Sequence, residues 1–159
     1  MSKLLICGGR EFTDSRLLNN ILNRFQRKYS PITLVIQGDA RGADSLGKLY
    51  AKQNDIPVES FPAKWDVYGR SAGIRRNELM LAQNPDYVIG FFGGRGTAHM
   101  LKIAREKKVR TFHIDKTMDA HGGRYIRIHD NESCFRFGGL ALMTSFRYTQ
   151  SKGCTYWYS

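Results

Sequence analysis

The sequence has few cysteines and no long apolar run. Cys7, Cys134 and Cys154 are odd in number and widely spaced, without the spacing of a metal-ligand pair. No stretch approaches the roughly 20 apolar residues that a membrane span needs, and the apolar run at 4–7 is too short for a signal peptide. We therefore expect a cytoplasmic protein with reduced thiols that associates with no membrane and holds neither a metal nor a resident cofactor.

Acidic residues are scarce relative to basic ones. The chain carries 25 Lys and Arg against 14 Asp and Glu, a net charge of +11, and the excess is spread without a basic tail or block. Spread positive charge suits an anionic partner and raises its encounter rate without identifying it. A small phosphorylated ligand and a nucleic acid both fit, but the lack of a clustered basic stripe makes the nucleic acid the weaker alternative.

Short apolar runs alternate with amphipathic segments up to about residue 115. Helical spacing of the apolar residues predicts helices after Asp14, over 44–54, over 72–83, and after residue 97. In the helix over 44–54, Leu46, Leu49 and Tyr50 should face inward. Residues 62–71 read as a loop. Strands are predicted at 3–7, 32–36, 58–61, 87–92 and 109–114. This alternation predicts an α/β fold, a doubly wound parallel sheet with helices on both faces.

From Lys116 the pattern changes, which divides the chain into an α/β domain over 1–115 and a small β-rich extension over 116–159. Residues 119–123 read as a linker turn, and 125–129 with 133–137 alternate like the two arms of a β-hairpin. The tail from residue 140 is rich in Thr, Tyr, Phe and Trp, which predicts one or two further strands. The extension is too short to fold alone, so we expect it to pack on the core or on another subunit.

Three glycine-containing turns follow predicted strands, at 8–9, 38–42 and 93–96. Because crossovers between parallel strands are right-handed, these turns should open on one edge of the sheet, where doubly wound folds bind ligands. The third turn leads from a strand into a helix, which directs backbone N–H groups at an anion, and its glycines let a phosphate approach the backbone. This predicts a phosphate site for a nucleotide-like ligand; the alternative is a tight turn of any α/β protein.

Four motifs stand in a characteristic order: GGREFTD at 8–14, GDARGAD at 38–44, Trp65 with GRSAGIRRNELM at 69–80, and FFGGRGT at 91–97. Together they resemble the YspA-type branch of the SLOG superfamily, the cpYpsA-related proteins, over residues 3 to about 115. The resemblance implies a Rossmann-like fold that binds nucleotides or nucleotide derivatives. The wider superfamily includes the LOG phosphoribohydrolases, which cleave the N-glycosidic bond of a nucleoside monophosphate. Other members sense NAD-derived or related signals, or bind DNA.

The match to the LOG enzymes is incomplete. Residues 76–80, RNELM, match the LOG pattern Arg-Lys-x-x-Met, and Arg76 stands at its catalytic arginine. Residues 93–97, GGRGT, match the core of Pro-Gly-Gly-x-Gly-Thr-x-Glu-Glu, but His99 and Met100 occupy the two glutamate positions. The missing carboxylate weighs against a LOG-type hydrolase.

Cleavage of a glycosidic bond through an oxocarbenium-like state needs a carboxylate near the anomeric carbon. Glu11, Asp14, Asp39 and Asp44 lie in the predicted turns, and Asp39 or Asp44 could substitute or bind a ribose diol. The alternative for Asp39 is a role in the turn, and the alternative for Asp44 is a helix cap. For Asp14 the helix cap is the better interpretation. Arg76, Asp39 and Asp44 are therefore the candidate catalytic residues.

Six arginines lie in or beside these turns, and the guanidinium fork suits phosphate oxygens, although single arginines are more often solvated or ion-paired. Trp65 and Tyr68 could stack on a base or fill the groove beside the loop, and His99 is a weak acid/base candidate. The predicted ligand-binding residues are Gly8, Gly9, Arg10, Gly38, Arg41, Gly42, Trp65, Arg70, Gly93, Gly94, Arg95, Gly96 and Thr97.

Two functions are compatible with these features. The missing glutamate favours a binder that senses or sequesters a nucleotide or an NAD-derived ligand such as an ADP-ribose derivative. An N-glycosidic, phosphoribohydrolase-like enzyme is the alternative. Relatives in the superfamily commonly assemble, so we expect a homo-oligomer, and the aromatic-rich extension either forms its interface or caps a monomer.

Overall fold

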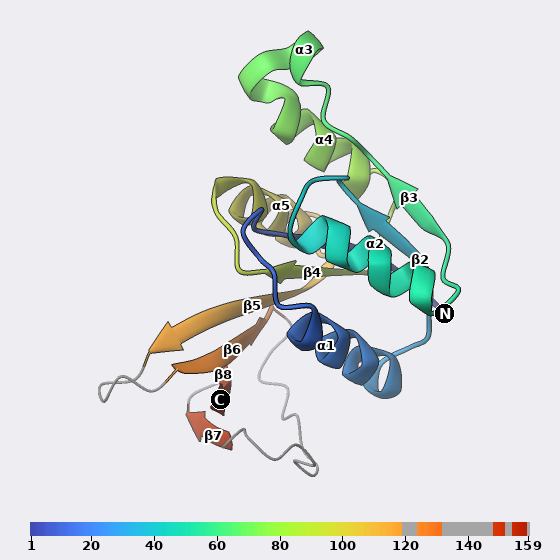
Figure 1. Cartoon of the computed structure of the whole chain (residues 1–159). Coiled ribbons are helices and arrows are strands. Elements are labelled where there is room, and N and C mark those ends of the chain that lie inside the picture. The colour runs from blue at the N-terminus through green and yellow to red at the C-terminus, as the bar shows by residue number, and fades with distance from the viewer. Residues whose placement is uncertain (119–123, 132–147, 152–153, 159) are drawn as a thin grey trace.

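A computed structural model describes residues 1–118, 124–131, 148–151 and 154–158. Its sheet has the order β3-β2-β1-β4-β5-β6-β8-β7 (Figure 1). The first five strands in this order pair in parallel, and they are β1 (Ser2–Gly8), β2 (Ile32–Gln37), β3 (Val58–Ser60), β4 (Tyr87–Phe91) and β5 (Arg110–Met118). The order 3-2-1-4-5 is that of a Rossmann-like, doubly wound sheet, which confirms the predicted fold class.

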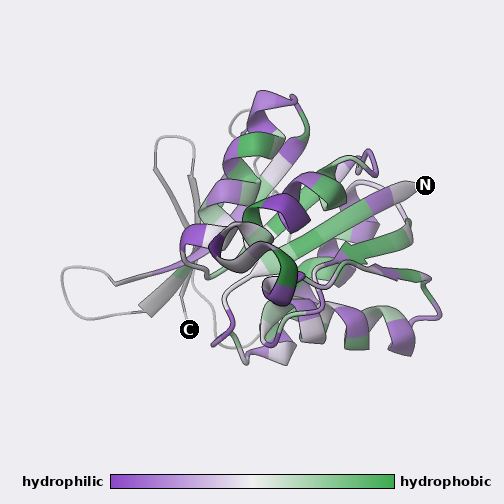
Figure 2. Ribbon diagram, turned by 90° about the horizontal axis from the view of Figure 1, so that it is seen from above, coloured by the Kyte–Doolittle hydropathy of each residue, from purple (hydrophilic) through white to green (hydrophobic). Residues whose placement is uncertain are grey.

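The helices cover both faces of the sheet. They are α1 (Ser15–Lys28), α2 (Ala43–Gln53), α3 (Trp65–Tyr68), α4 (Ala72–Leu81) and α5 (Arg95–Glu106). Successive residues of β1 alternate between the faces: Leu4 and Ile6 pack with α1 and α2, whereas Leu5 and Cys7 pack with α4 and α5. Figure 2 shows the central strands as predominantly hydrophobic and the helices as mixed, with hydrophilic residues along them. An apolar core therefore packs on each face of the sheet.

Helix α1 begins where its capping residue was predicted. The Asp14 carboxylate accepts a hydrogen bond from the Leu17 backbone N–H at 2.9 Å, which satisfies one of the free donors at the helix start. Leu18, Leu22 and Phe25 follow at helical spacing and are buried against the sheet. The N-cap interpretation of Asp14 is confirmed.

Helix α2 buries the predicted face except at one position. Tyr50 is buried and Leu46 is partly buried against the core, as expected, but Leu49 is 47% exposed. The buried stripe consists of small residues, and a Cβ on Gly47 would lie 3.0 Å from the Ile6 side chain. Because small residues allow the helix to approach β1 closely, Ala43, Gly47 and Ala51 select the buried face, and the larger Leu49 is left outside.

The segment predicted as a loop at 62–71 contains α3 and a turn of 3-10 helix at Gly69–Ser71. None of the residues of α3 is buried, so no apolar periodicity marked it in the sequence. The ring of Trp65 lies against α4, where a Cβ on Gly73 would contact it at 3.5 Å. In Figure 1, α3 projects beyond α4 and away from the sheet.

The sheet continues past β5 by antiparallel pairing with β6 (Arg124–Asp130), and β8 (Cys154–Tyr158) and β7 (Tyr148–Ser151) follow. One or two further strands were expected in the tail, and two are present. Both edges of β6 are occupied between 125 and 128, by β5 and β8, so the predicted pairing of this strand was wrong. Alternation of apolar and polar residues predicts a strand but does not determine which strand it pairs with.

The predicted second hairpin arm at 133–137 and the linker turn at 119–123 lie outside the described residues. Strand β5 runs through the predicted boundary at residue 115, and the division into two domains stays a prediction. Within the described part of the chain, none of the helices combines the length and apolar character that a bilayer crossing requires.

Candidate functional site

The three glycine turns meet at the carboxyl edge of the sheet, between β1 and β4. The Gly9 N–H lies 3.1 and 2.9 Å from the carbonyl oxygens of Phe91 and Phe92, and the Ala43 N–H donates to the Gly9 carbonyl at 3.2 Å. A Cβ on Gly8 would lie 2.5 Å from the Ala43 Cβ and 2.6 Å from the Phe91 oxygen. The first turn is thus packed between the other two. This edge is the topological switch point, where doubly wound folds bind their ligands.

The third turn ends at the uncapped N-terminus of α5. Gly94 is the N-cap residue and supplies no side-chain hydrogen bond. The N–H of Ala98 donates to the Gly94 carbonyl at 3.0 Å, whereas the N–H groups of Arg95, Gly96 and Thr97 have no acceptor among the described residues. Such first-turn donors carry the positive end of the helix dipole. The start of α5 is therefore positively polarised and favours the binding of an anion.

Two glycines of this turn are not demanded by the fold. A Cβ on Gly94 or Gly96 would meet no atom of the described residues within 4 Å, and neither residue has a positive φ. Gly93 differs, because a Cβ there would overlap the Thr97 side chain. The missing side chains at 94 and 96 therefore leave open surface directly at the helix start.

Arg76 extends from α4 to the second turn. Its Nη1 donates to the Gly38 carbonyl at 2.7 Å and lies 3.7 Å from Oδ2 of Asp44, with side chains 15% and 6% exposed. Its Nε is buried without a hydrogen-bond partner in the described part of the chain. A Cβ on Gly38 would overlap the guanidinium. Gly38 is therefore needed to admit Arg76.

Asp44 is a buried carboxylate and does not cap α2, whose N-cap is Gly42. Its Oδ2 accepts from the Ala40 N–H at 3.3 Å. Burial raises the pKa of its carboxyl to about 6, against the lowering effect of the Arg76 guanidinium and of backbone hydrogen bonds. Burial, with the nearby Asp44 carboxylate, also raises the pKa of the Cys7 thiol. Cys7 is therefore a packed thiol with little nucleophilic character.

The exposed charges of the second turn are used in surface ion pairs. Asp39 has a φ of 54° and pairs with Lys48 at 2.9 Å, while Arg41 pairs with Glu11. The left-handed backbone of Asp39 agrees with the turn role considered for it. Asp39 and Asp44 thus lie in different surroundings, one exposed and paired with lysine, the other buried beside arginine.

Aromatic rings on α3 carry arginines on their faces. The Arg10 guanidinium lies 5.4 Å from the Trp65 ring centroid, and that of Arg75 lies 4.6 Å from the Tyr68 centroid. Trp65 and Tyr68 are 47% and 41% exposed. Four of the six arginines have no carboxylate partner among the residues described, namely Arg10, Arg70, Arg75 and Arg95. Aromatic faces and unpaired cations therefore border the turns.

Asn77 lies at the candidate site, although no motif in the sequence singled it out. Its side chain is 3% exposed, and its Nδ2 lies 3.0 Å from the Gly96 carbonyl oxygen and 3.2 Å from Nδ1 of His99. The available signal was a polar residue next to Arg76, at the position where the LOG pattern has lysine. Asn77 joins α4 to the start of α5.

Residues 2–68 match the profile of the YspA, cpYpsA-related SLOG family. The Gene 61 protein of Mycobacterium phage D29 is 30% identical to this chain, in an alignment covering 67% of this chain and 90% of the phage protein. The chain belongs to the YspA, cpYpsA-related SLOG family. The family resemblance drawn from the motifs is thereby confirmed, while the role of each residue in this SLOG protein stays a prediction.

Two structures of phosphoribosylglycinamide formyltransferase follow a related chain path. The Coxiella burnetii enzyme, in complex with CHES, gives a TM-score of 0.47, and that of Campylobacter jejuni subsp. jejuni NCTC 11168 gives 0.46, each at 14% identity over 80% of this chain. The SLOG chain spans 64% of the Coxiella enzyme and 73% of the Campylobacter enzyme.

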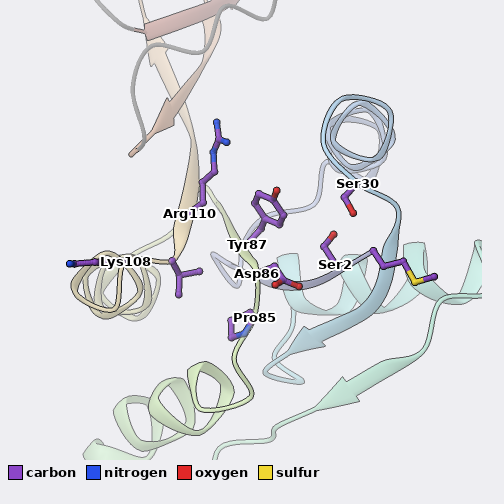
Figure 3. Close-up of a pocket in the computed structure, with 9 residues that line it drawn as sticks. Ser2, Ser30, Pro85, Asp86, Tyr87, Lys108 and Arg110 are labelled. Atoms are coloured by element: carbon purple, nitrogen blue, oxygen red, sulfur yellow. The ribbon is translucent and has the colours of Figure 1, made fainter.

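A hollow of about 420 Å³ lies at the opposite edge of the SLOG sheet, at the amino ends of β1, β4 and β5 (Figure 3). Ser2, Asp86, Tyr87 and Arg110 are among its lining residues. The Asp86 carboxylate accepts from the Lys3 N–H at 2.8 Å, and the Arg110 guanidinium pairs with Asp130 at 2.8 Å. These polar groups join elements of the fold, and none of the predicted ligand residues lines this hollow.

Proposed function

We propose that this SLOG protein binds a nucleotide or nucleotide-derived ligand at the carboxyl edge of its sheet and senses or sequesters it. The observation that carries the proposal is the start of α5, where unpaired N–H groups of Arg95, Gly96 and Thr97 coincide with glycines that the fold does not demand. A phosphate accepts hydrogen bonds from such donors and is favoured by the helix dipole. The exposed Arg95 side chain adds a fork of donors beside it.

The spacing along α4 supports a ligand of nucleotide size. Gly73 lies against Trp65, and Asn77 lies against Gly96 of the phosphate turn. Asn77 comes four positions after Gly73 on the helix, a rise of about 6 Å. In this proposal one ligand places its base on Trp65 and its phosphate at the turn.

The charge distribution favours binding over cleavage. Hydrolysis of an N-glycosidic bond needs an available carboxylate, and His99 and Met100 stand where the LOG enzymes have glutamates. Asp39 is paired with Lys48, and Asp44 is held against Arg76. The hydrolase alternative therefore depends on Asp44, since burial raises the pKa of its carboxyl to about 6 and a raised pKa is typical of general acids.

Nucleic-acid binding is the second alternative. Exposed aromatic rings with arginines on them, as at Trp65 and Tyr68, are a feature of single-strand binding surfaces. The spread of the +11 charge argues against it. The homo-oligomeric state and the cytoplasmic location stay predictions from the sequence.

The deciding experiment is incubation of the full chain with AMP, GMP, NAD, ADP-ribose and cyclic ADP-ribose, followed by mass spectrometry. Free ligand, products and whatever the denatured protein releases are quantified separately. We expect one compound to be depleted from solution and recovered intact after denaturation. Free base with ribose phosphate would instead establish the hydrolase, and no depletion of any compound would contradict a nucleotide site.

A further inference from the structure

The orientation of the Asn77 amide follows from its surroundings. Its Nδ2 lies within hydrogen-bond distance of the Gly96 carbonyl oxygen, which can only accept. The NH2 group must therefore face Gly96, because the reversed amide would set two acceptors against each other. This removes the usual ambiguity between the oxygen and nitrogen of an asparagine side chain.

The second proton of the same NH2 group faces His99. Nδ1 of the ring lies 3.2 Å from Nδ2 of Asn77, so it accepts and carries no proton. The proton of the neutral imidazole is then on Nε2. Nε2 has no hydrogen-bond partner among the described residues. The His99 side chain is half-buried, and Nε2 is not one of the buried polar atoms that lack a partner. It is thus an accessible N–H beside the phosphate turn.

We propose that His99 acts in the ligand site as a neutral Nε2–H hydrogen-bond donor, and that Asn77 is the positioning residue that fixes this tautomer. The proposal deepens the nucleotide-binding function and rests on it for the identity of the acceptor, a ligand oxygen. A neutral imidazole held in this way is a donor like those that polarise carbonyl groups in enzymes.

This assignment replaces the acid/base role considered for His99. A general base needs a free nitrogen lone pair, and that of Nδ1 is occupied by Asn77. A general acid needs the imidazolium, whose Nδ1–H would face the Asn77 NH2 group. His99 therefore binds an acceptor and does not move a proton, which agrees with a site that retains its ligand intact.

Asn77 also orients a donor of the phosphate turn. The Gly96 carbonyl and the Thr97 N–H belong to one planar peptide group, so holding the carbonyl fixes the direction of the N–H. Asn77 thus sets two donors, the Thr97 N–H and the His99 Nε2–H, from one buried position. Both would contact the same ligand.

The tautomer is tested without any ligand. Long-range ¹H–¹⁵N spectra of the full chain distinguish the two neutral tautomers, and His99→Gln assigns the signals. In the alkaline limit of a pH series we expect protonated Nε2 and unprotonated Nδ1 in the wild type. In Asn77→Asp the carboxylate should draw a proton to Nδ1. An Nδ1–H tautomer or an averaged mixture in the wild type would overturn the assignment, whatever the nucleotide panel shows.

The donor role is tested with AMP as the probe. His99→Phe should weaken AMP binding about 10-fold, the typical effect of losing one hydrogen bond to a charged group. His99→Gln, whose amide nitrogen reaches the position of Nε2, should stay within about threefold of the wild type. Equal affinity in His99→Phe and the wild type would remove His99 from the site. Failure of AMP to bind the wild type would contradict the phosphate-site proposal and leave the spectroscopic result to decide the tautomer.

Discussion

At the scale of single residues, Asp44 is the carboxylate on which the proposed hydrolase alternative depends. It is the buried carboxylate that Arg76 holds at the second turn, and burial raises its pKa to about 6. Such a shift is typical of catalytic acids, but burial alone produces it in structural carboxylates as well. Its effect on stability can be measured apart from any activity.

Asp44→Asn should flatten the pH dependence of stability. The folded-state pKa of about 6 exceeds the ordinary value of 3.8, so between these values the folded chain binds more protons than the unfolded chain. Stability of the wild type should therefore fall as the pH rises through this range, by about 3 kcal/mol from this group. Urea unfolding at a series of pH values measures the difference between wild type and variant. Parallel profiles would show that Asp44 titrates normally.

Gly94 and Gly96 of the third turn should matter for the ligand and not for the fold. Gly94→Val adds atoms where a Cβ meets nothing, so they would fill the space proposed for the phosphate. We expect AMP binding to weaken about 10- to 100-fold, with adenosine binding nearly unchanged, because only the phosphate uses the turn. Arg95→Ala should act in the same direction. Calorimetry with both ligands checks this, and equal losses for AMP and adenosine would refute the assignment of the phosphate turn.

Gly8→Ala provides the matched control. The new Cβ would lie 2.5 Å from the Ala43 Cβ and 2.6 Å from the Phe91 oxygen, in the packed contact between turns. Overpacking of this kind lowers the free energy of unfolding by about 1–3 kcal/mol. Comparison of Gly8→Ala with Gly94→Val thus distinguishes a glycine that the fold needs from a glycine that only a ligand would need.

At the scale of elements, the periodic segments were predictable and the contacts between them were less so. The parallel strands and the N-cap of α1 follow from runs and spacings that one segment contains. Helix α3 has no buried residue, so its four residues left no periodic signal. The buried face of α2 depends on how closely Gly47 approaches Ile6, which is a property of two elements.

Helix α3 supplies the prediction that belongs to this scale. Trp65→Ala should weaken AMP and adenosine binding equally, by roughly 5- to 100-fold, because stacking of a base is worth about 1–3 kcal/mol. Val67→Ala is the control, since Val67 is 67% exposed on the same short helix. Fluorescence titration with both ligands measures the effect. An unchanged affinity in Trp65→Ala would mean that Trp65 only packs against α4.

At the scale of the whole molecule, the sheet brings together turns that lie far apart in the sequence. Their meeting at one edge could be predicted, because strand order and crossover handedness place the carboxyl ends of parallel strands side by side. The bridge from Asn77 to Gly96 and His99 could not, because it depends on the distance between α4 and α5. The partner of β6 was missed for a related reason: alternation determines the faces of a strand and leaves its neighbours open.

The net charge of +11 gives the last prediction, which separates a nucleotide site from a nucleic-acid surface. A polynucleotide held by six to ten phosphate contacts loses about 10³- to 10⁵-fold in affinity between about 50 and 200 mM salt. AMP or ADP-ribose engages one or two phosphates, so its affinity should fall far less over that range. Fluorescence anisotropy with a labelled single-stranded oligonucleotide, beside calorimetry with ADP-ribose, measures both slopes. We expect oligonucleotide binding at low salt only, because the positive charge is spread and forms no stripe. Oligonucleotide binding that persists at the higher salt and exceeds that of ADP-ribose would make nucleic acid the partner of the arginines around α3.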